Sequence, residues 1–522
     1  MNIRSRSREL VFALLTAHQL GAAARSFDVV VYGATASGSI AAIAAARNGV
    51  SVALLEPGRF IGGMTTGGLG QTDFGKKETI GGYSLEFYQR VGRHYNHRVD
   101  WQFEPHVAEA VLRDMLAEAR VPVFFLHRLM EKNGVRKSGG RVQEIRLDNG
   151  ASFRAKVFID ATYEGDLMAQ SGVSYTWGRE SAQQYGESLA GVRPRDKNHQ
   201  FDVPVPAFDT AHKLLPEIRR GPRGAIGAGD RKVQAYNFRL CLTDDAANFF
   251  AFPRPLRYNV RRYALLVWLV NALTEHNHHP PRLEDLIYFG RLPNHKADVN
   301  NRGAFSTDYI GASWDYPEAN YRRRAQIWQD HIDYTAGFFY FLANDPQLPE
   351  SLRLEMRRWG LARDEFPKTN HWPTQLYVRE ARRMTGDYVM TQKDIQTELV
   401  KDDSIGMGSY NSDSHNVQRY AEPDGTVQNE GNMEVPVRPY QIPYRALLPK
   451  RAQIQNLLVP VCLSASHVAY STLRMEPVYM ILGQAAGEAA ALAARSGSPV
   501  QDVRIGQLRD ALTAHDAVLT SR

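Results

Sequence analysis

The stretch from residue 29 to residue 56 constrains the fold of this chain more than any other. Phe27–Tyr32 is a run of mostly β-branched residues, which is typical of a buried parallel strand. The turn "GATASG" at 33–38 follows at once, and a helix of very small residues leads into a second apolar strand. A strand–turn–helix–strand unit of this kind opens doubly wound folds, so the sequence predicts an α/β protein with a Rossmann-like sheet.

The turn has the residue types that a diphosphate needs. Gly33 permits a tight turn, and Gly38 lets the helix pack close to the strand. The free N–H groups and the positive dipole end of the helix attract a pyrophosphate. Thr35 stands where the middle glycine of the GxGxxG pattern is usual, and its hydroxyl can donate to a phosphate. The predicted diphosphate contacts are Gly33, Ala34, Thr35, Ser37 and Gly38.

An acidic residue, Glu56, ends the second strand about twenty residues after the turn. A carboxylate there accepts hydrogen bonds from ribose hydroxyls and repels a 2′-phosphate. This unit alone does not separate NAD from FAD. The segment after Glu56 does, because Gly62-Gly63 precede Met64 and three more glycines follow by residue 70. Glycine lets backbone approach a flat ring closely, so we expect a flavin beside Gly62, Gly63 and Met64.

On these motifs the sequence resembles the FAD-dependent oxidoreductases of the glutathione-reductase-like fold. Within them it is similar to a family whose members often carry only that label or a xanthan-lyase-like one. The resemblance runs from residue 27 to about residue 494 and implies FAD as cofactor. It also implies that the strand ending at Asp160, Ala161 and Thr162 lies beside the dinucleotide, although Tyr163 stands where family patterns often have glycine.

The resemblance implies a further cofactor contact near the C-terminus. Pro477 suits the first turn of a helix that runs to about residue 495 and stops at Gly497. Gly483 and Gly487 are one turn apart, so one face of this helix can pack tightly. In this fold such a helix directs its positive end at the N1–O2 edge of the flavin, and we include both glycines among the cofactor residues.

The FAD-binding domain is therefore expected to be discontinuous, with a first part at 27–180 and a C-terminal part at 431–522. The turn "DNG" at 148–150 lies between alternating strands and predicts a small inserted β-meander. Residues 181–430, which are rich in Arg, Tyr, Trp, His and Pro, are expected to form a mixed α+β domain that covers the substrate. Its predicted helices are 258–275, 317–343 and 347–361.

Residues 1–24 have the layout of a signal peptide, with three arginines, the apolar run 10–15 and a small-residue site at 22–24. We therefore predict a secreted or periplasmic protein; a cytoplasmic enzyme with a frayed leader is the alternative. No later run is apolar enough to cross a bilayer, and the best of them, Tyr263–Leu273, reads as a buried helix.

The net charge of +7 does not indicate a nucleic-acid partner, because Lys and Arg are interleaved with Asp and Glu along the chain. No zinc-finger spacing and no aromatic RNA-binding signature is present. Cys241 and Cys462 lie among apolar or small residues and are predicted to be buried thiols, although one disulfide stays open. The histidines of "EHNHHPP" lack a metal-ligand pattern, so we predict a surface loop there and no metal.

The loop after the last predicted FAD strand, "SASHVAYSTLRMEP", offers polar groups that would face the flavin. His467 is the predicted base, because a neutral imidazole suits proton abstraction near pH 7. Arg474 could hold an anionic group or the flavin O2, and Tyr470 and Glu476 stand nearby. A structural histidine that bonds the backbone is the alternative for His467.

A second polar and aromatic cluster lies in the middle region and could line a pocket for a hydroxyl-rich ligand, although such residues also occur in surface loops. Its members are His371, Trp372, Arg379, Asn411, Asp413 and His415.

Together these features predict an enzyme that takes a hydride from a C–H bond beside a hydroxyl or amine, onto flavin N5. The substrate would be a polar small molecule such as a carbohydrate, and the sequence does not indicate the electron acceptor. No second glycine-rich strand–helix unit is present for NAD(P)H. The alternative is a flavin-binding, or polysaccharide-binding or lyase-type, protein without redox turnover.

Overall fold

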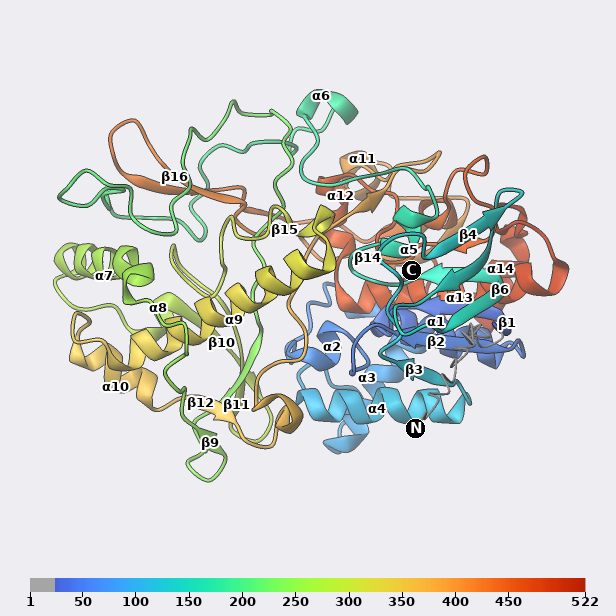
Figure 1. Cartoon of the computed structure of the whole chain (residues 1–522), viewed down its shortest axis with the longest axis horizontal. Coiled ribbons are helices and arrows are strands. Elements are labelled where there is room, and N and C mark those ends of the chain that lie inside the picture. Colours follow the sequence, from blue (N-terminus) through green and yellow to red (C-terminus); the bar gives the residue numbers. More distant parts are fainter. Residues whose placement is uncertain (1–23, 522) are drawn as a thin grey trace, which may run out of the picture.

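The computed structural model describes residues 24–521, so the predicted leader lies outside the described residues except for its last position. Two regions lie side by side (Figure 1). One holds a twisted sheet built from both ends of the described chain, and the other holds an antiparallel sheet with long helices from the middle of the chain.

The sheet of the first region is parallel at its centre, in the order β3-β2-β1-β6, with β20 beside β6. Val31 of the central strand β1 lies between Leu54 and Ile159 of its two neighbours. The predicted Rossmann-like sheet is thereby confirmed. Its strands are β1 (Arg25–Tyr32), β2 (Val52–Glu56), β3 (Val123–Phe125), β6 (Ser152–Asp160) and β20 (Leu457–Leu458).

The predicted meander is present, but its last strand is the central strand β6 itself. β4 (Val135–Ser138), β5 (Arg141–Arg146) and β6 pair antiparallel in sequence order. The turn before β6 ends at Gly150, whose φ of +83° is the left-handed conformation that glycine adopts readily. The meander is therefore an extension of the main sheet.

Alternation along β1 separates the two faces of the sheet. Val29 and Val31 point into a core formed with the helices, and Val30 and Tyr32 point into a core formed with the meander. The helical face is covered by helices from both ends of the chain, and α1 packs directly on α13. These helices are α1 (Ala36–Arg47), α3 (Gly82–His94), α4 (Pro105–Glu118) and α13 (Glu476–Ser496).

The second region contains a five-stranded antiparallel sheet in the order β10-β11-β8-β12-β9. Its strands are β8 (Leu240–Thr243), β9 (Phe249–Phe250), β10 (Ile287–Leu292), β11 (Lys296–Asn301) and β12 (Gly360–Ala362). Three helices stand where helices were predicted: α7 (Ala264–Asn277), α9 (Tyr321–Asn344) and α10 (Glu350–Arg357). The first begins later than predicted, because Val260–Tyr263 form a 3₁₀ turn.

Short elements link the two regions, and β14 (Ser404–Gly408) pairs with β19 (Tyr440–Pro443) and packs on α13. The other strands are β7 (Tyr175–Thr176), β13 (Arg383–Met384), β15 (Ser412–Ser414), β16 (Gln418–Ala421), β17 (Val427–Glu430) and β18 (Met433–Val435). The other helices are α2 (Met64–Gly67), α5 (Asp166–Gln170), α6 (Ala182–Tyr185), α8 (Leu283–Leu286), α11 (Gln392–Gln396), α12 (His467–Leu473) and α14 (Ile505–Ala514).

Three smaller predictions can be compared with the structure. Cys241 and Cys462 are buried free thiols, as expected. The histidines at 276, 278 and 279 are exposed around the end of α7. None of the helices described in residues 24–521 has the length and hydropathy needed to cross a membrane.

Candidate functional site

The glycine turn between β1 and α1 has the tight geometry expected of a diphosphate-binding loop. Gly33 has a φ of +95°, and a Cβ there would lie 2.7 Å from the Thr162 side chain. A Cβ at Gly38 would overlap the Gly33 carbonyl oxygen, so the helix begins directly on the turn. The hydroxyl of Ser37 is buried and has no hydrogen-bond partner among the described residues.

The hydroxyl of Thr35 is used inside the protein. It donates to the Ala161 carbonyl at 2.8 Å and accepts the Gly38 N–H at 3.1 Å, so Thr35 caps α1. The expectation that this hydroxyl points to a phosphate is therefore not what the structure shows. The threonine replaces the middle glycine because its side chain ties the turn to the end of β6, and backbone N–H groups remain to meet an anion.

Glu56 closes the other side of the turn. Its carboxylate accepts the Ala34 N–H at 2.8 Å and the Gly58 N–H at 2.6 Å, and burial raises its pKa to about 7. A cavity of about 290 Å³ opens beside it. The cavity is lined by the predicted cofactor residues Gly33, Thr35, Glu56, Gly63 and Thr162, together with Arg128 and Trp328.

Helix α9 of the second region covers this cleft. A second cavity of about 330 Å³ shares Arg128, Thr162 and Trp328 with the first. The Arg128 guanidinium lies 4.4 Å from the ring centroid of Tyr321, at the start of α9. Neither Arg128 nor the two aromatic residues were predicted to lie at the cofactor site; the only sequence signal was aromatic residues on the apolar face of α9.

The strand end at Asp160 is closed by local hydrogen bonds. The buried Asp160 carboxylate accepts the Thr162 N–H and hydroxyl and the Met168 N–H, at 2.7–3.1 Å, and burial raises its pKa to about 6. Asp160 therefore shapes the loop, and its oxygens are already occupied. Thr162 lines both cavities, while the Ala161 carbonyl accepts the hydrogen bond from the Thr35 hydroxyl.

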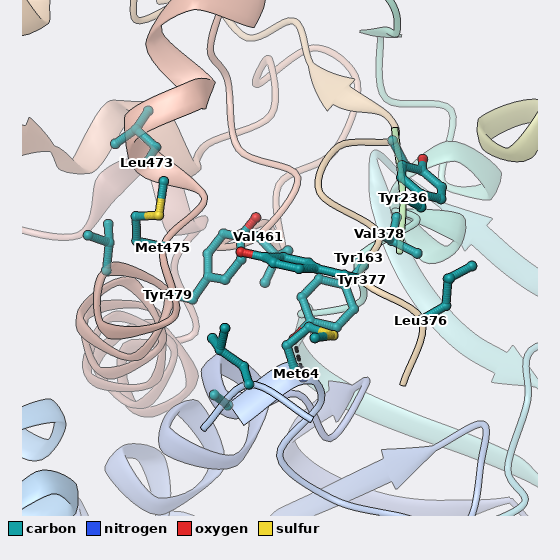
Figure 2. Close-up of a cluster of buried hydrophobic side chains, with 14 of the residues drawn as sticks. Met64, Tyr163, Tyr236, Leu376, Tyr377, Val378, Val461, Leu473, Met475 and Tyr479 are labelled. Atoms are coloured by element: carbon teal, nitrogen blue, oxygen red, sulfur yellow. Dashed lines mark hydrogen bonds between the residues drawn. The ribbon is translucent and has the colours of Figure 1, made fainter. Parts of the chain in front are cut away.

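The second glycine segment folds against Tyr163, as Figure 2 shows. The Gly62 N–H donates to the Ala34 carbonyl at 2.6 Å, which ties this segment to the turn. Gly63 has a φ of +55°, and a Cβ there would overlap the Tyr163 hydroxyl. That hydroxyl also accepts the Met64 N–H at 2.9 Å. Tyr163 thus packs on the glycines that were predicted to lie beside the flavin ring.

Glu476 occupies the first position of α13. It accepts the Tyr163 hydroxyl at 2.8 Å and the Thr65 hydroxyl at 2.9 Å, with no Lys, Arg or His within 4 Å among residues 24–521. Burial raises its pKa to about 7. Gly483 and Gly487 lie further along the helix, where a Cβ would overlap the carbonyls of Ser37 and Ala41. Their geometry is that of helix packing, which positions α13 on α1, and not of direct cofactor contact.

The predicted base, His467, is 2 % exposed, and both of its ring nitrogens are engaged. Nδ1 lies 2.8 Å from Glu380 and Nε2 lies 3.3 Å from the Ser414 hydroxyl. Tyr470 is also buried, and its hydroxyl lies 2.7 Å from that of Tyr479. These two side chains therefore face other side chains of the protein.

Arg474 lies in a cluster of charged and tyrosine side chains, which we call the charged junction. Its members are Asp73, Tyr377, Tyr410, Asp413 and Arg474. Arg474 donates to the Asp413 carbonyl at 2.8 Å, lies 3.2 Å from the Asp413 carboxylate, and donates to the Tyr377 hydroxyl at 3.1 Å. Asp73, six residues after Gly67, accepts the Tyr410 hydroxyl at 3.1 Å. Burial raises the pKa of Asp73, and Arg239 and, less strongly, Arg474 counteract this increase.

The structure divides the predicted middle cluster. Arg379, Asp413 and His415 meet at the junction, where His415 Nδ1 lies 2.7 Å from Asp308. Asn411 is exposed. The other two lie elsewhere: His371 packs on Phe250, and Trp372 lines a largely apolar cavity of about 830 Å³.

A family model described as FAD dependent oxidoreductase matches residues 28–512. The chain belongs to the FAD dependent oxidoreductase family. It is an FAD-dependent enzyme, and the whole arrangement from turn to junction lies within the matched residues.

Solved flavoprotein structures share only part of this oxidoreductase. The 3-ketosteroid-Δ4-(5α)-dehydrogenase of Rhodococcus jostii RHA1 is 16 % identical over 28 % of this chain and 47 % of its own, with a TM-score of 0.21. The thioredoxin reductase of T. acidophilum is 22 % identical over 30 % and 37 %, with a TM-score of 0.18. The L-proline dehydrogenase of P. horikoshii is 13 % identical over 30 % and 59 %, with a TM-score of 0.24. The chain therefore spans 37–59 % of the length of these three structures, and no curated protein matches it.

The residues of this FAD-dependent oxidoreductase fit its cofactor. The turn has glycine at Gly33 and Gly38, where a Cβ would collide with neighbouring atoms. The buried Ser37 hydroxyl has no hydrogen-bond partner among the described residues, and the turn bounds the cavity beside Glu56. Glu56 lies at the position where a ribose-binding carboxylate is expected in this type of fold.

Proposed function

We propose that this FAD-dependent oxidoreductase oxidises a polar small molecule at a C–H bond that bears a hydroxyl or amine. A carbohydrate is the substrate class that the polar groups favour. The observation that supports this proposal is the charged junction beyond the glycine segment, where Asp73, Asp413 and Arg474 meet Tyr377 and Tyr410.

The cofactor would be held by the turn at 33–38, by Glu56 and by Thr162, with the segment 62–64 beside its ring. When bound, FAD supplies the acceptor for the hydride. The rest of the chemistry belongs to the chain, which has to bind the substrate, orient it, exclude water and accept a proton.

The junction suits a substrate with several hydroxyl groups. Asp73 and the Asp413 side chain, which is 19 % exposed, present carboxylate oxygens that accept hydrogen bonds from hydroxyls. Arg474 is nearly fully buried and is held in one orientation by Asp413 and Tyr377, so its remaining donor capacity has a fixed direction. Fixed donors and acceptors of both kinds select a polar ligand over an apolar one.

We assign His467 and Tyr470 a positioning role. His467 connects Glu380 to Ser414, and this bond holds the strand β15 that carries the junction residues. Tyr470 holds Tyr479 beside Tyr163. Arg474 remains the proposed substrate-holding residue of the three that the sequence indicated.

The experiment is an anaerobic reduction assay on the purified holoprotein. Sugars, sugar acids, amino sugars, simple alcohols and amines are added separately, and the flavin absorbance near 450 nm is followed. We expect bleaching by a hydroxylated or aminated polar compound, and a higher KM for that compound in Arg474→Lys. Conversion of a polysaccharide with no bleaching by any compound would instead support the lyase-type alternative.

A further inference from the structure

One buried histidine of the junction has an arrangement that the buried histidines at 331 and 467 lack. His415 follows β15 and is 8 % exposed. Its Nδ1 lies 2.7 Å from Asp308 Oδ2. Its Nε2 makes no hydrogen bond within residues 24–521, and the nearest carboxylate oxygen, on Asp413, is 3.8 Å away.

The state of Asp308 fixes the proton on the ring of His415. Burial alone would raise the pKa of Asp308, but Arg379 and His415 bring it to about 2, so the carboxylate is ionised and only accepts hydrogen bonds. Nδ1 of His415 must then carry the proton, and Nε2 presents a lone pair. This is the tautomer that a general base needs.

The other buried histidines, and two histidines that pair with glutamates nearer the surface, differ from His415 in one of two ways. His467 has both nitrogens engaged, and so has buried His331, with the Ile327 carbonyl and Ser313. His106 and His515 pair with glutamates, but their side chains are 45 % and 35 % exposed. Among the buried histidines of residues 24–521, His415 is therefore distinguished by a ring nitrogen that makes no hydrogen bond.

We propose that His415 is the general base of the oxidation, oriented through Nδ1 by Asp308, which is held in turn by Arg379. This inference rests on the function proposed above and names the residue that accepts the proton. Asp308 and Arg379 are positioning residues, because the arginine lies 3.3 Å from the carboxylate and donates to Asn237 and the Ala235 carbonyl.

The contacts of the junction connect Nε2 to the predicted ring site. Asp413, which faces Nε2, binds Arg474, and Arg474 binds the Tyr377 hydroxyl. Figure 2 shows Tyr377 beside Tyr163 and above Met64, the residue that ends the glycine segment. We therefore expect a substrate held by Arg474 to lie between His415 and that segment.

The step balances with one base and one hydride acceptor. The O–H bond of the substrate breaks and its proton passes to Nε2. The C–H bond breaks, and its hydrogen leaves with both bonding electrons as a hydride for FAD. The C–O single bond of the substrate becomes a carbonyl. Imidazole becomes imidazolium, whose charge the ionised Asp308 stabilises.

Burial of the ring keeps His415 neutral near pH 7. Burial and then Arg379 lower its pKa, while Asp308 and Asp413 oppose that decrease. A neutral base is ready at pH 7, and reduction should slow only on the acid side. The titratable and charged groups that face His415 or lie just beyond are Asp308, Arg379, His199, Asp413, Glu434 and Arg474.

The test compares anaerobic flavin reduction in stopped flow, using the compound that bleaches the wild-type holoenzyme. We expect His415→Gln to slow reduction by at least about 100-fold with unchanged FAD affinity and melting temperature. His279→Gln, on the surface beyond α7, serves as the matched control and should keep the wild-type rate. A reduction rate in His415→Gln within a few-fold of wild type would overturn the assignment while leaving the proposed function intact.

A second measurement needs no substrate, so it separates this inference from the proposed function. Protein labelled with ¹⁵N-histidine is compared with the same labelled His415→Gln, which identifies the His415 ring nitrogens. We expect a protonated Nδ1 and an unprotonated Nε2 at pH 7, and loss of that tautomer preference in Asp308→Asn. A proton on Nε2 in the wild type would exclude the role of base.

Discussion

The Tyr163 hydroxyl donates a hydrogen bond of 2.8 Å to the carboxylate of Glu476, and this contact joins the loop after β6 to the first turn of α13. The two residues lie 313 positions apart in the sequence. Both are buried, and a second hydroxyl, from Thr65, is the other partner of the carboxylate. Burial destabilises the charged form of the Glu476 carboxyl, and the two hydroxyl hydrogen bonds offset only part of that effect.

The first prediction concerns the pH dependence of stability. Burial raises the pKa of Glu476 to about 7 from its ordinary value of 4.5, so the folded state holds the proton more tightly than the unfolded state. Stability from this group is therefore present at low pH and is lost as pH rises from about 4.5 through 7, by about 3 kcal/mol at most. Glu476→Gln should remove that loss.

The measurement is the free energy of unfolding of both proteins at pH 5 and pH 8. We expect the free energy of unfolding of the glutamine variant, relative to that of the wild type, to be higher at pH 8 than at pH 5. A difference between the two proteins that does not depend on pH would contradict the burial argument.

The second prediction concerns cofactor affinity. Glu56→Gln replaces the carboxyl that accepts the Ala34 and Gly58 N–H groups and that we expect to bind the ribose of FAD. Hydrogen bonds to charged groups contribute about 1.5–3 kcal/mol, so FAD should bind about 10- to 100-fold more weakly. Titration of apoprotein with FAD by flavin fluorescence measures this change. Glu144→Gln on the meander is the control and should keep the wild-type affinity.

The third prediction tests the packing of α13 on α1. Gly483→Ala places a Cβ on the Ser37 carbonyl and should destabilise the protein by about 1–3 kcal/mol, because both helices must shift. Gly506 in α14 has open space around it, so Gly506→Ala should instead stabilise by about 0.5–1 kcal/mol. Chemical denaturation measures both variants. Equal effects of the two substitutions would mean that the close approach of the helices is not required.

The fourth prediction concerns a buried lysine that joins the two regions. Lys296 Nζ lies 2.6 Å from Glu104, 2.7 Å from Asp364 and 2.8 Å from Glu365, and its side chain is fully buried. Lys296→Met leaves these carboxylates without their cation and should cost about 3–5 kcal/mol. The loss in free energy of unfolding should be smaller at low pH, where the carboxylates take up protons.

The same variant offers a metal readout. The ligand atoms of Glu104, His106 and Glu365 lie within 4.8 Å of one another. With the ammonium removed, we expect Zn²⁺ to raise the melting temperature of Lys296→Met and to leave that of the wild type unchanged. A variant as stable as the wild type would show that the lysine is not required at this interface.

The sequence predicted what local spacing encodes. The turn at 33–38, the acidic end of β2 and the Gly497 stop of α13 depend on neighbours in sequence, and the structure has the turn, the strand and the helix in place. The use of the Thr35 hydroxyl could not be predicted, because its acceptor, Ala161, is 126 residues away.

The site chemistry depended even more on distant contacts. The sequence placed His415 in a polar cluster and His467 after the last strand, and chose the second for its position. What separates them is whether Nε2 is engaged, which depends on Ser414 and Asp308. No spacing rule links Asp308 to His415, because they lie 107 residues apart in the sequence.

The docking of α13 on α1 has a consequence for biosynthesis. A ribosome releases α1 well before the helix that covers its small-residue face, because residues 48–475 lie between them. The nucleotide-binding half is therefore incomplete until α13 has emerged, and loading of the prosthetic group has to follow that step. Nascent chains stalled before residue 476 should then present an uncovered alanine-rich surface to chaperones.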